Sequence, residues 1–297
     1  MRDWPPITEP ELLERLALDD EQFRAAFQEV VAAWPRRTYD EAFFAHARGY
    51  PFERPPGSYV LRGETVELLS EAGTAERIST IAALTDGRHP IVSFGANAAP
   101  SRLALKFAHL PDEADREVLV LTGDLHDLDI GAVPSAPLVG YVPGSLFESP
   151  GTAVRAAVIW VTPAQVTQLA WTEPSYQLGR LEEARFEVDE EDLEIDALFA
   201  FIARLGALCI DGEPVALAAV PAKGRTATAM TQEELLDAVA RLVLGPEARA
   251  EDLARASCED MAAVFNRAVE TVWPLGRRLT SRWTPYPSSG VSFPPGR

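Results

Sequence analysis

Cysteine and histidine are scarce in this chain. Its 297 residues include two cysteines, Cys209 and Cys258, and four histidines. The two cysteines lack the spacing of a metal site, and His46 and His89 have no second ligand near them in sequence. We therefore expect no metal and no other cofactor. Both thiols should be unpaired in a reducing cytoplasm, with one disulfide between them as the alternative.

Basic residues and long apolar runs are also lacking. Lys and Arg total 27 against 45 Asp and Glu, which gives a net charge of −18. Such a field repels polyanions, so we expect neither a nucleic-acid partner nor binding to an acidic membrane. No apolar run approaches the roughly 20 residues that span a bilayer, and the first residues lack a signal-peptide pattern. We expect a cytoplasmic protein with a small-molecule substrate.

The rest of the composition is that of a globular protein, with 47% hydrophobic residues. Residues 1–88 carry helical periodicity with one small hairpin, and they could cover a pocket or form the contact of a homo-oligomer. Residues 89–229 are rich in strand patterns. Residues 230–297 combine capped helices with a tail rich in Pro and Ser. The sequence thus predicts an α+β fold whose strand-rich core has helical extensions at both ends.

The most informative stretch of the chain leads to an acidic residue. Val154–Val161 is apolar and β-branched apart from one arginine, which predicts a largely buried strand. Thr162 and Gln165 then form a capping box for a helix. Glu173 precedes Pro174, and a residue before proline is biased out of the helical region. Its carboxylate should project from a helix end, either as a general base or as a solvated surface group.

A second candidate element follows another short strand. Ile91–Phe94 runs into the small residues Gly95–Ala98, and a helix is expected from Pro100. A strand, a glycine turn and a helix N-terminus together present backbone N–H groups that can hold a carboxylate or an oxyanion. Many such turns bind nothing. The turn is not a dinucleotide fingerprint, because the later glycines are missing.

Four segments in order resemble the γ-glutamylcyclotransferase-like family. FGANAAPSRL is similar to the YGSNL loop of that family, and LHDLDIG (Leu125–Gly131) to its second core strand. LFESPGTAVRAAVIWV (Leu146–Val161) resembles the F-x-S-P-G element and central strand. VTQLAWTE (Val166–Glu173) resembles the helix that ends in the catalytic glutamate. The resemblance covers roughly residues 90–226 and implies a small mixed β-barrel surrounded by helices.

Three positions depart from the family pattern. Phe94 stands where the family loop has tyrosine, Ala96 where it has serine, and Pro174 where a glycine commonly follows the glutamate. Gly95 and Asn97 are retained. Because two hydroxyl groups are lost from the loop, the polar contacts to the substrate must differ from those of the family.

The resemblance implies cyclisation of a γ-glutamyl amide to 5-oxoproline with release of an amine. Glu173 would be the general base, because only the free amine is nucleophilic. Tyr176 either contacts the substrate or packs in the core. Two alternatives are another amide-cleaving or lyase reaction on the same scaffold and a non-catalytic binding module. An enzyme requires Glu173 and the turn to face one pocket. The predicted substrate-binding residues are Phe94, Gly95, Ala96, Asn97, Ala98 and Tyr176.

Overall fold

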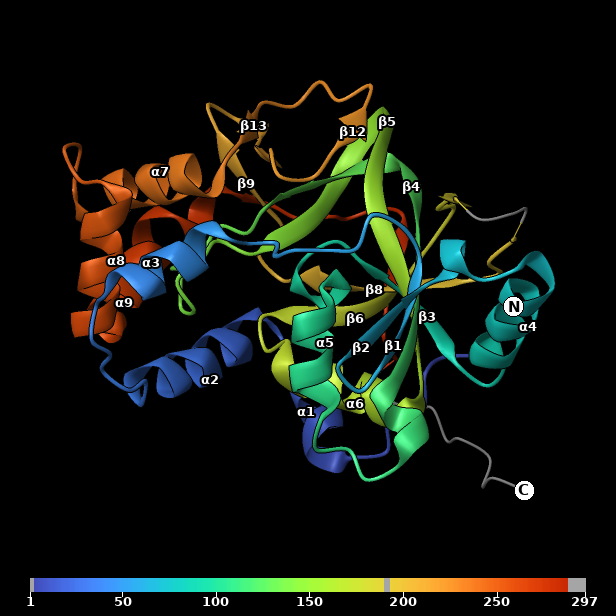
Figure 1. The fold of residues 1–297 in the computed structure, drawn as a ribbon. Coiled ribbons are helices and arrows are strands. Elements are labelled where there is room, and N and C mark those ends of the chain that lie inside the picture. Colours follow the sequence, from blue (N-terminus) through green and yellow to red (C-terminus); the bar gives the residue numbers. More distant parts are fainter. Residues whose placement is uncertain (1–2, 190–192, 288–297) are drawn as a thin grey trace.

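A large mixed sheet forms the centre of the protein (Figure 1). The computed structural model describes residues 3–189 and 193–287. Along the sheet the order is β13-β11-β4-β5-β3-β8-β6-β15, with β1, β2, β7 and β12 added at its sides. Most pairs are antiparallel, whereas β3 with β8 and β11 with β13 are parallel. The strands are β1 (Tyr59–Arg62), β2 (Thr65–Leu68), β3 (His89–Ser93), β4 (Glu117–Ala132), β5 (Gly144–Val161), β6 (Tyr176–Leu181), β7 (Phe186–Val188), β8 (Leu198–Ala203), β11 (Ala216–Leu217), β12 (Ala222–Lys223), β13 (Ala229–Met230) and β15 (Trp283–Pro285).

The two longest strands, β4 and β5, carry this sheet. They have 16 and 18 residues and pair antiparallel from Leu119 opposite Trp160 to Ala132 opposite Gly144. A bulge interrupts the register at Asp127, whose φ of 60° is the left-handed conformation that a bulge accommodates. The other edge of β4 is shared by β1, β7 and β11 in turn. Five other strands, β1, β3, β7, β11 and β12, therefore pair directly with one of these two strands.

Side chains along β5 alternate between two hydrophobic cores, as the period of a strand requires. Val158 and Trp160 join the core that contains α2 and the C-terminal helices. Ile159 and Val161 join the core that contains α1, α5 and α6. The sheet is consequently covered by helices on both faces. This explains why Val154–Val161 is apolar apart from Arg155, rather than alternating between apolar and polar residues.

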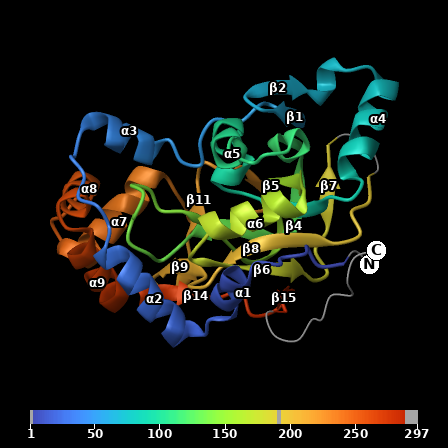
Figure 2. The ribbon, with the colours of Figure 1, turned by 90° about the horizontal axis from the view of Figure 1, so that it is seen from below.

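The helices gather in groups that both views show. Helices α7, α8 and α9 stack at one end with α2 and α3 beside them, and α4 lies at the opposite end (Figures 1 and 2). Helices α5 and α6 contact each other. The helices are α1 (Pro10–Ala17), α2 (Asp20–Ala32), α3 (Glu41–Arg48), α4 (Thr74–Thr85), α5 (Pro100–Phe107), α6 (Pro163–Thr172), α7 (Gln232–Leu244), α8 (Ala250–Glu259) and α9 (Met261–Thr271), with 3₁₀ turns at Leu69–Glu71, Ala96–Ala98, Glu113–Arg116 and Trp273–Leu275.

The predicted α+β class is confirmed, whereas closure of the strands into a barrel is not. Among the described residues, no pairing joins the two ends of the sheet. Strand β1 from the N-terminal region pairs with β4, and β15 from the C-terminal region pairs with β6. A smaller sheet of β9 (Ala207–Ile210), β10 (Glu213–Pro214) and β14 (Gly276–Arg277) packs beside them. Residues 288–297 of the predicted tail lie outside the described residues.

Local signals in the sequence are reproduced at most helix starts. Thr162 accepts a hydrogen bond from the Gln165 backbone in a complete capping box, as predicted. Ser257 is buried within α8, and the side chain of Asp260 caps α9. Cys209 and Cys258 are buried free thiols. Within the described part of the chain, no helix has the length and apolar character needed to cross a membrane.

The register of β7 on β4 leads to a prediction for Gly123. A Cβ at this position would overlap the Glu187 carbonyl oxygen and the Phe186 ring. Gly123→Ala should therefore lower the free energy of unfolding by about 1–3 kcal/mol, the usual range for overpacking. Chemical denaturation measures the change. Gly73→Ala is the matched control, because a Cβ there meets no atom within 4 Å. Equal stability of the two variants would contradict the pairing of β7 with β4.

Candidate functional site

A cavity of about 550 Å³ opens between the end of β3, helix α5 and the residues after α6. The segment that joins β4 to β5 and the helices α2 and α9 complete its wall. Small-molecule sites commonly have volumes of about 300–1,000 Å³. The cavity is therefore large enough for a metabolite-sized ligand. Most of the residues predicted from the sequence lie in this one place.

Four of the five predicted substrate-binding residues that follow β3 line the cavity: Phe94, Gly95, Ala96 and Asn97. Ala98 is not part of the lining. It is buried, and its carbonyl accepts a hydrogen bond from the Tyr59 hydroxyl at 3.0 Å. The structure therefore places Ala98 in the core beside the cavity and not in its wall.

The turn presents unused backbone donors. Ala98 N–H donates to the Gly95 carbonyl at 3.2 Å, which closes the 3₁₀ turn. The N–H groups of Gly95, Ala96 and Asn97 have no hydrogen-bond acceptor among the described residues. A chain reversal before a helix commonly leaves such donors, and they suit an anion or a developing oxyanion. The turn has the donors that the sequence predicted.

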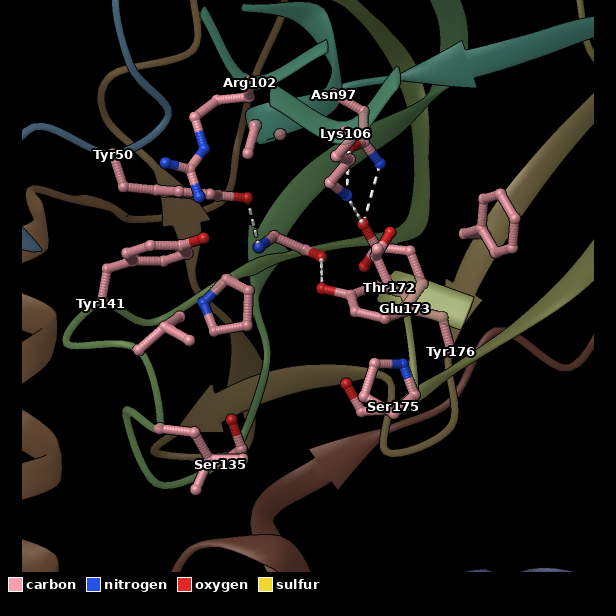
Figure 3. Close-up of a pocket in the computed structure, with 18 of the residues that line it drawn as sticks. Tyr50, Asn97, Arg102, Lys106, Ser135, Tyr141, Thr172, Glu173, Ser175 and Tyr176 are labelled. Atoms are coloured by element: carbon pink, nitrogen blue, oxygen red, sulfur yellow. Dashed lines mark hydrogen bonds and ion pairs between the residues drawn. The ribbon is translucent and has the colours of Figure 1, made fainter. Parts of the chain in front are cut away.

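Glu173 lies at the centre of the polar side of the cavity. Helix α6 ends at Thr172, and Glu173 has the non-helical angles φ −115° and ψ 59°, as expected of a residue before proline. Its Oε1 accepts a hydrogen bond from Asn97 Nδ2 at 2.9 Å and another from Lys106 Nζ at 2.8 Å (Figure 3). Lys106 also donates to Asn97 Oδ1 at 2.7 Å. In the described structure Oε2 has no hydrogen bond, so one carboxylate oxygen is held and the other is available.

Two cations of α5 were not predicted from the sequence. Lys106 and Arg102 are four residues apart and both line the cavity, so they lie on one face of the helix. The Arg102 guanidinium lies 5.0 Å from the centre of the Phe52 ring, and within the described residues it has no ion pair. Glu173 is the one carboxylate among the described lining residues. Arg102 is therefore available to an anionic ligand. The signal for both was their spacing in the helix that follows the turn.

Three tyrosines form another wall. Gly144 N–H donates to the Tyr50 hydroxyl at 2.7 Å, and the Tyr176 hydroxyl donates to the Gly144 carbonyl at 2.8 Å. Tyr141 stacks on Tyr50 with ring centres 4.5 Å apart. Burial raises the pKa of each of the three phenols above the ordinary range. All three remain neutral near pH 7, and the Tyr50 hydroxyl keeps its own proton to donate.

Tyr176 was predicted either to contact substrate or to pack. It lines the cavity, and its hydroxyl is occupied by Gly144. Trp171, two residues before Glu173, is not among the lining residues, and its indole donates to Glu9 at 2.6 Å. Glu148 is exposed on β5 and outside the lining. Across residues 3–189 and 193–287, no group of three or more His, Cys, Asp or Glu residues is arranged to hold a metal.

The N-terminal region holds both functional elements in place. Arg54 is partly buried, and its Nη2 donates to the carbonyls of Phe94 and Gly95, each at 2.9 Å. Arg15 donates to the Ala170 carbonyl at 2.8 Å, at the end of the helix that precedes Glu173. Side chains that bind the last carbonyls of a helix fix its end. Residues 1–88 thus position the turn and the glutamate.

The chain matches no known family model, no curated protein and no solved structure. The likeness to the γ-glutamylcyclotransferase-like family consequently rests on the sequence motifs. The site geometry is independent of that likeness, because it follows from the contacts of Glu173, Asn97 and Lys106. A function for the site has to be argued from these groups.

A close approach explains the glycine of the turn and leads to a prediction. Gly95 has φ −111°, which other residues also adopt, but a Cβ there would overlap the Tyr50 hydroxyl oxygen. Gly95→Ala should lower the free energy of unfolding by about 1–3 kcal/mol in the wild type. In a Tyr50→Phe background the same substitution should cost less than about 1 kcal/mol. Denaturation of the four proteins of this double-mutant cycle measures the coupling.

The control for this cycle uses the neighbouring phenol. Tyr141→Phe removes a hydroxyl for which no hydrogen bond is present among the described residues, and it leaves the Tyr50 hydroxyl in place. Gly95→Ala should then cost as much as in the wild type. If Gly95→Ala lowers the free energy of unfolding as much in the Tyr50→Phe background as in the wild type, the glycine is required for a reason other than this contact.

The raised pKa values of Tyr50 and Tyr176 predict a loss of stability in alkali. Both phenols keep their protons in the folded state at a pH where the unfolded chain, with an ordinary pKa of about 10, has begun to lose them. Their contribution is fully present below about pH 10 and is lost as the pH rises. Denaturation between about pH 8 and 11 should show this fall, and Tyr176→Phe should make it less steep. An unchanged slope would contradict burial of this hydroxyl.

Proposed function

We propose that the protein cyclises a γ-glutamyl amide to 5-oxoproline and releases an amine, with Glu173 as the general base. One observation carries the proposal. Glu173, Asn97 and the glycine turn face the same cavity, and the Glu173 side chain is only 18% exposed. A non-catalytic binding module would not need the one carboxylate of the described lining to be held by Asn97 and Lys106 and mostly shielded from solvent. The proposed scaffold is the small mixed barrel that the family resemblance implies.

The reaction begins with a proton transfer. The α-amine of the substrate is an ammonium group near pH 7, and only its free base can attack the γ-carbonyl carbon. Oε2 of Glu173 accepts the proton, while Oε1 stays bound to Asn97 and Lys106. The new C–N bond closes the five-membered ring. As the old C–N bond breaks, the protons taken from the attacking nitrogen pass through Glu173 to the leaving nitrogen, so the proton count balances.

The negative groups of the substrate need donors in fixed positions. The unused N–H groups of Gly95, Ala96 and Asn97 can receive the oxyanion that forms at the γ-carbonyl. Arg102, which has no carboxylate partner among the described residues, can bind the substrate α-carboxylate. Binding both ends of the γ-glutamyl group folds it so that nitrogen and carbonyl meet. Orientation of this kind is worth about 7–11 kcal/mol, so the ring closure needs no covalent nucleophile.

A second candidate is cleavage of an amide that lacks the γ-glutamyl group. The apolar side chains of Phe94 and Ala96 favour it, because they replace two hydroxyl groups of the family loop. Incubation with a panel of γ-glutamyl amides and of matched amides that lack the γ-glutamyl group, with mass-spectrometric detection of 5-oxoproline and of the released amine, distinguishes the two. Formation of 5-oxoproline supports the cyclisation. Amide cleavage without 5-oxoproline would support the second candidate.

Removal of the base tests the role of Glu173. Glu173→Gln keeps an acceptor oxygen for Asn97 and Lys106 but cannot take a proton. We expect turnover to fall roughly 10²–10⁴-fold, the usual scale for general-base catalysis. The KM should change much less, because binding rests on the turn and Arg102. Steady-state kinetics of 5-oxoproline formation measures both constants.

The matched control is Glu148→Gln, an exposed glutamate outside the cavity. It should leave turnover unchanged. Thermal denaturation of both variants separates a catalytic loss from an unfolded protein. Full activity of Glu173→Gln would place the base elsewhere.

A further inference from the structure

The cavity has a second part that the proposed chemistry does not use. Its polar groups come from the turn, α5 and the end of α6, whereas the wall formed by α2, α9 and the segment between β4 and β5 is apolar. We call this wall the apolar lobe. Four of its rings pack against one another, with neighbouring ring centres 5.2–6.2 Å apart. The lobe consists of Phe23, Phe27, Val30, Trp34, Leu138, Val139, Phe265 and Trp273.

The apolar lobe is open to solvent. Val30 is 52% exposed and Val139 is 39% exposed, and both line the cavity. Leu105, on the exposed side of α5, also lines it and is 66% exposed. Scattered single apolar residues are normal on a surface, but a group that borders one concave site marks a place where an apolar group binds. The lobe is therefore a binding surface and not only a part of the core.

The charges of the cavity lie outside the lobe. None of the lobe residues is ionisable, and the cations Arg102 and Lys106 belong to the polar side with Glu173. A ligand that fills the cavity must therefore be amphipathic. Its charged end contacts α5 and the turn, and its other end lies against α2 and α9.

We infer that the ligand of this site carries a bulky alkyl or aromatic group that occupies the apolar lobe, opposite an anionic end bound near Arg102. If the proposed function holds, on which this assignment to a leaving group rests, the apolar group belongs to the amine that is released. The γ-glutamyl group then fills the polar side only. Six of the eight lobe residues come from residues 1–88 and 230–297, so the helical extensions supply most of the surface that selects the ligand.

The first experiment measures binding without any turnover. Isothermal titration calorimetry compares acetate with octanoate, which share an anionic end and differ in the apolar chain. Octanoate should bind at least about tenfold more tightly, because its longer chain buries more methylene groups against the lobe. Equal affinity for the two carboxylates would overturn the inference, whatever the enzyme does to amides.

The second experiment compares γ-glutamyl methylamide with γ-glutamyl hexylamide. The hexyl compound should have a kcat/KM at least about tenfold higher, since contacts to the leaving amine extend into the lobe. If 5-oxoproline forms from both with equal kcat/KM, the proposed function stands and the assignment of the lobe to the leaving amine fails. If neither amide reacts while octanoate still binds more tightly than acetate, the ligand class stands and the proposed function fails.

A pair of variants locates the effect. Val30→Asp puts a charge on the lobe, and Ile78→Asp makes the same change at an equally exposed position, 52%, on α4 outside the cavity. Val30→Asp should reduce the advantage of the longer chain to less than about threefold, because burying the new carboxylate opposes apolar contact. Ile78→Asp should leave the advantage intact. Equal effects of the two variants would overturn the placement in the lobe, and both exposed positions should tolerate the change without unfolding.

Discussion

Oε1 of Glu173 is the atom on which the geometry of the candidate site depends. It accepts hydrogen bonds from Asn97 in the turn and from Lys106 in α5, and these two side chains also bind each other. Three segments that are separate in sequence are thus joined by one closed set of contacts. Because the charged and polar groups are already arranged before a ligand arrives, little reorganisation is needed during a reaction. The arrangement also distinguishes the two oxygens of the carboxylate, since only Oε2 can meet a substrate proton.

The N-terminal region explains why this set of contacts is held in place. Arg54 binds the carbonyls that precede the turn, Arg15 binds the end of α6, and the Tyr50 hydroxyl fills the space that Gly95 leaves open. Two of these contacts are hydrogen bonds to backbone carbonyls, and the third is packing against a glycine. They therefore fix the backbone around the site and do not involve the Glu173 side chain. Residues 1–88 are therefore part of the site, as the pairing of β1 with β4 also indicates.

Local signals in the sequence predicted the backbone features of the site better than they predicted its long-range side-chain contacts. The capping box at Thr162 and the turn of Glu173 out of α6 follow from neighbouring residues, so a short sequence window suffices. Tyr50 could not be found in this way, because its side chain reaches the cavity only after distant elements have packed. The burial of Ala98 outside the lining was not foreseen for the same reason: its carbonyl accepts a hydrogen bond from Tyr59, which is 39 residues away. The openness of the sheet also depends on edge pairings that periodicity does not specify.

The apolar lobe can affect the electrostatic interactions on the polar side of the cavity. Water in an unoccupied apolar lobe would keep the carboxylate and the two cations partly hydrated, and hydration weakens each of their interactions. An apolar group in the lobe would displace that water and strengthen the attraction between Oε2 of Glu173 and a substrate ammonium. The lobe should then influence the chemical step as well as affinity, because desolvation acts on the charges that move. Under the proposed function, this coupling would give α2 and α9 an influence on the reaction although their lobe side chains carry no ionisable group.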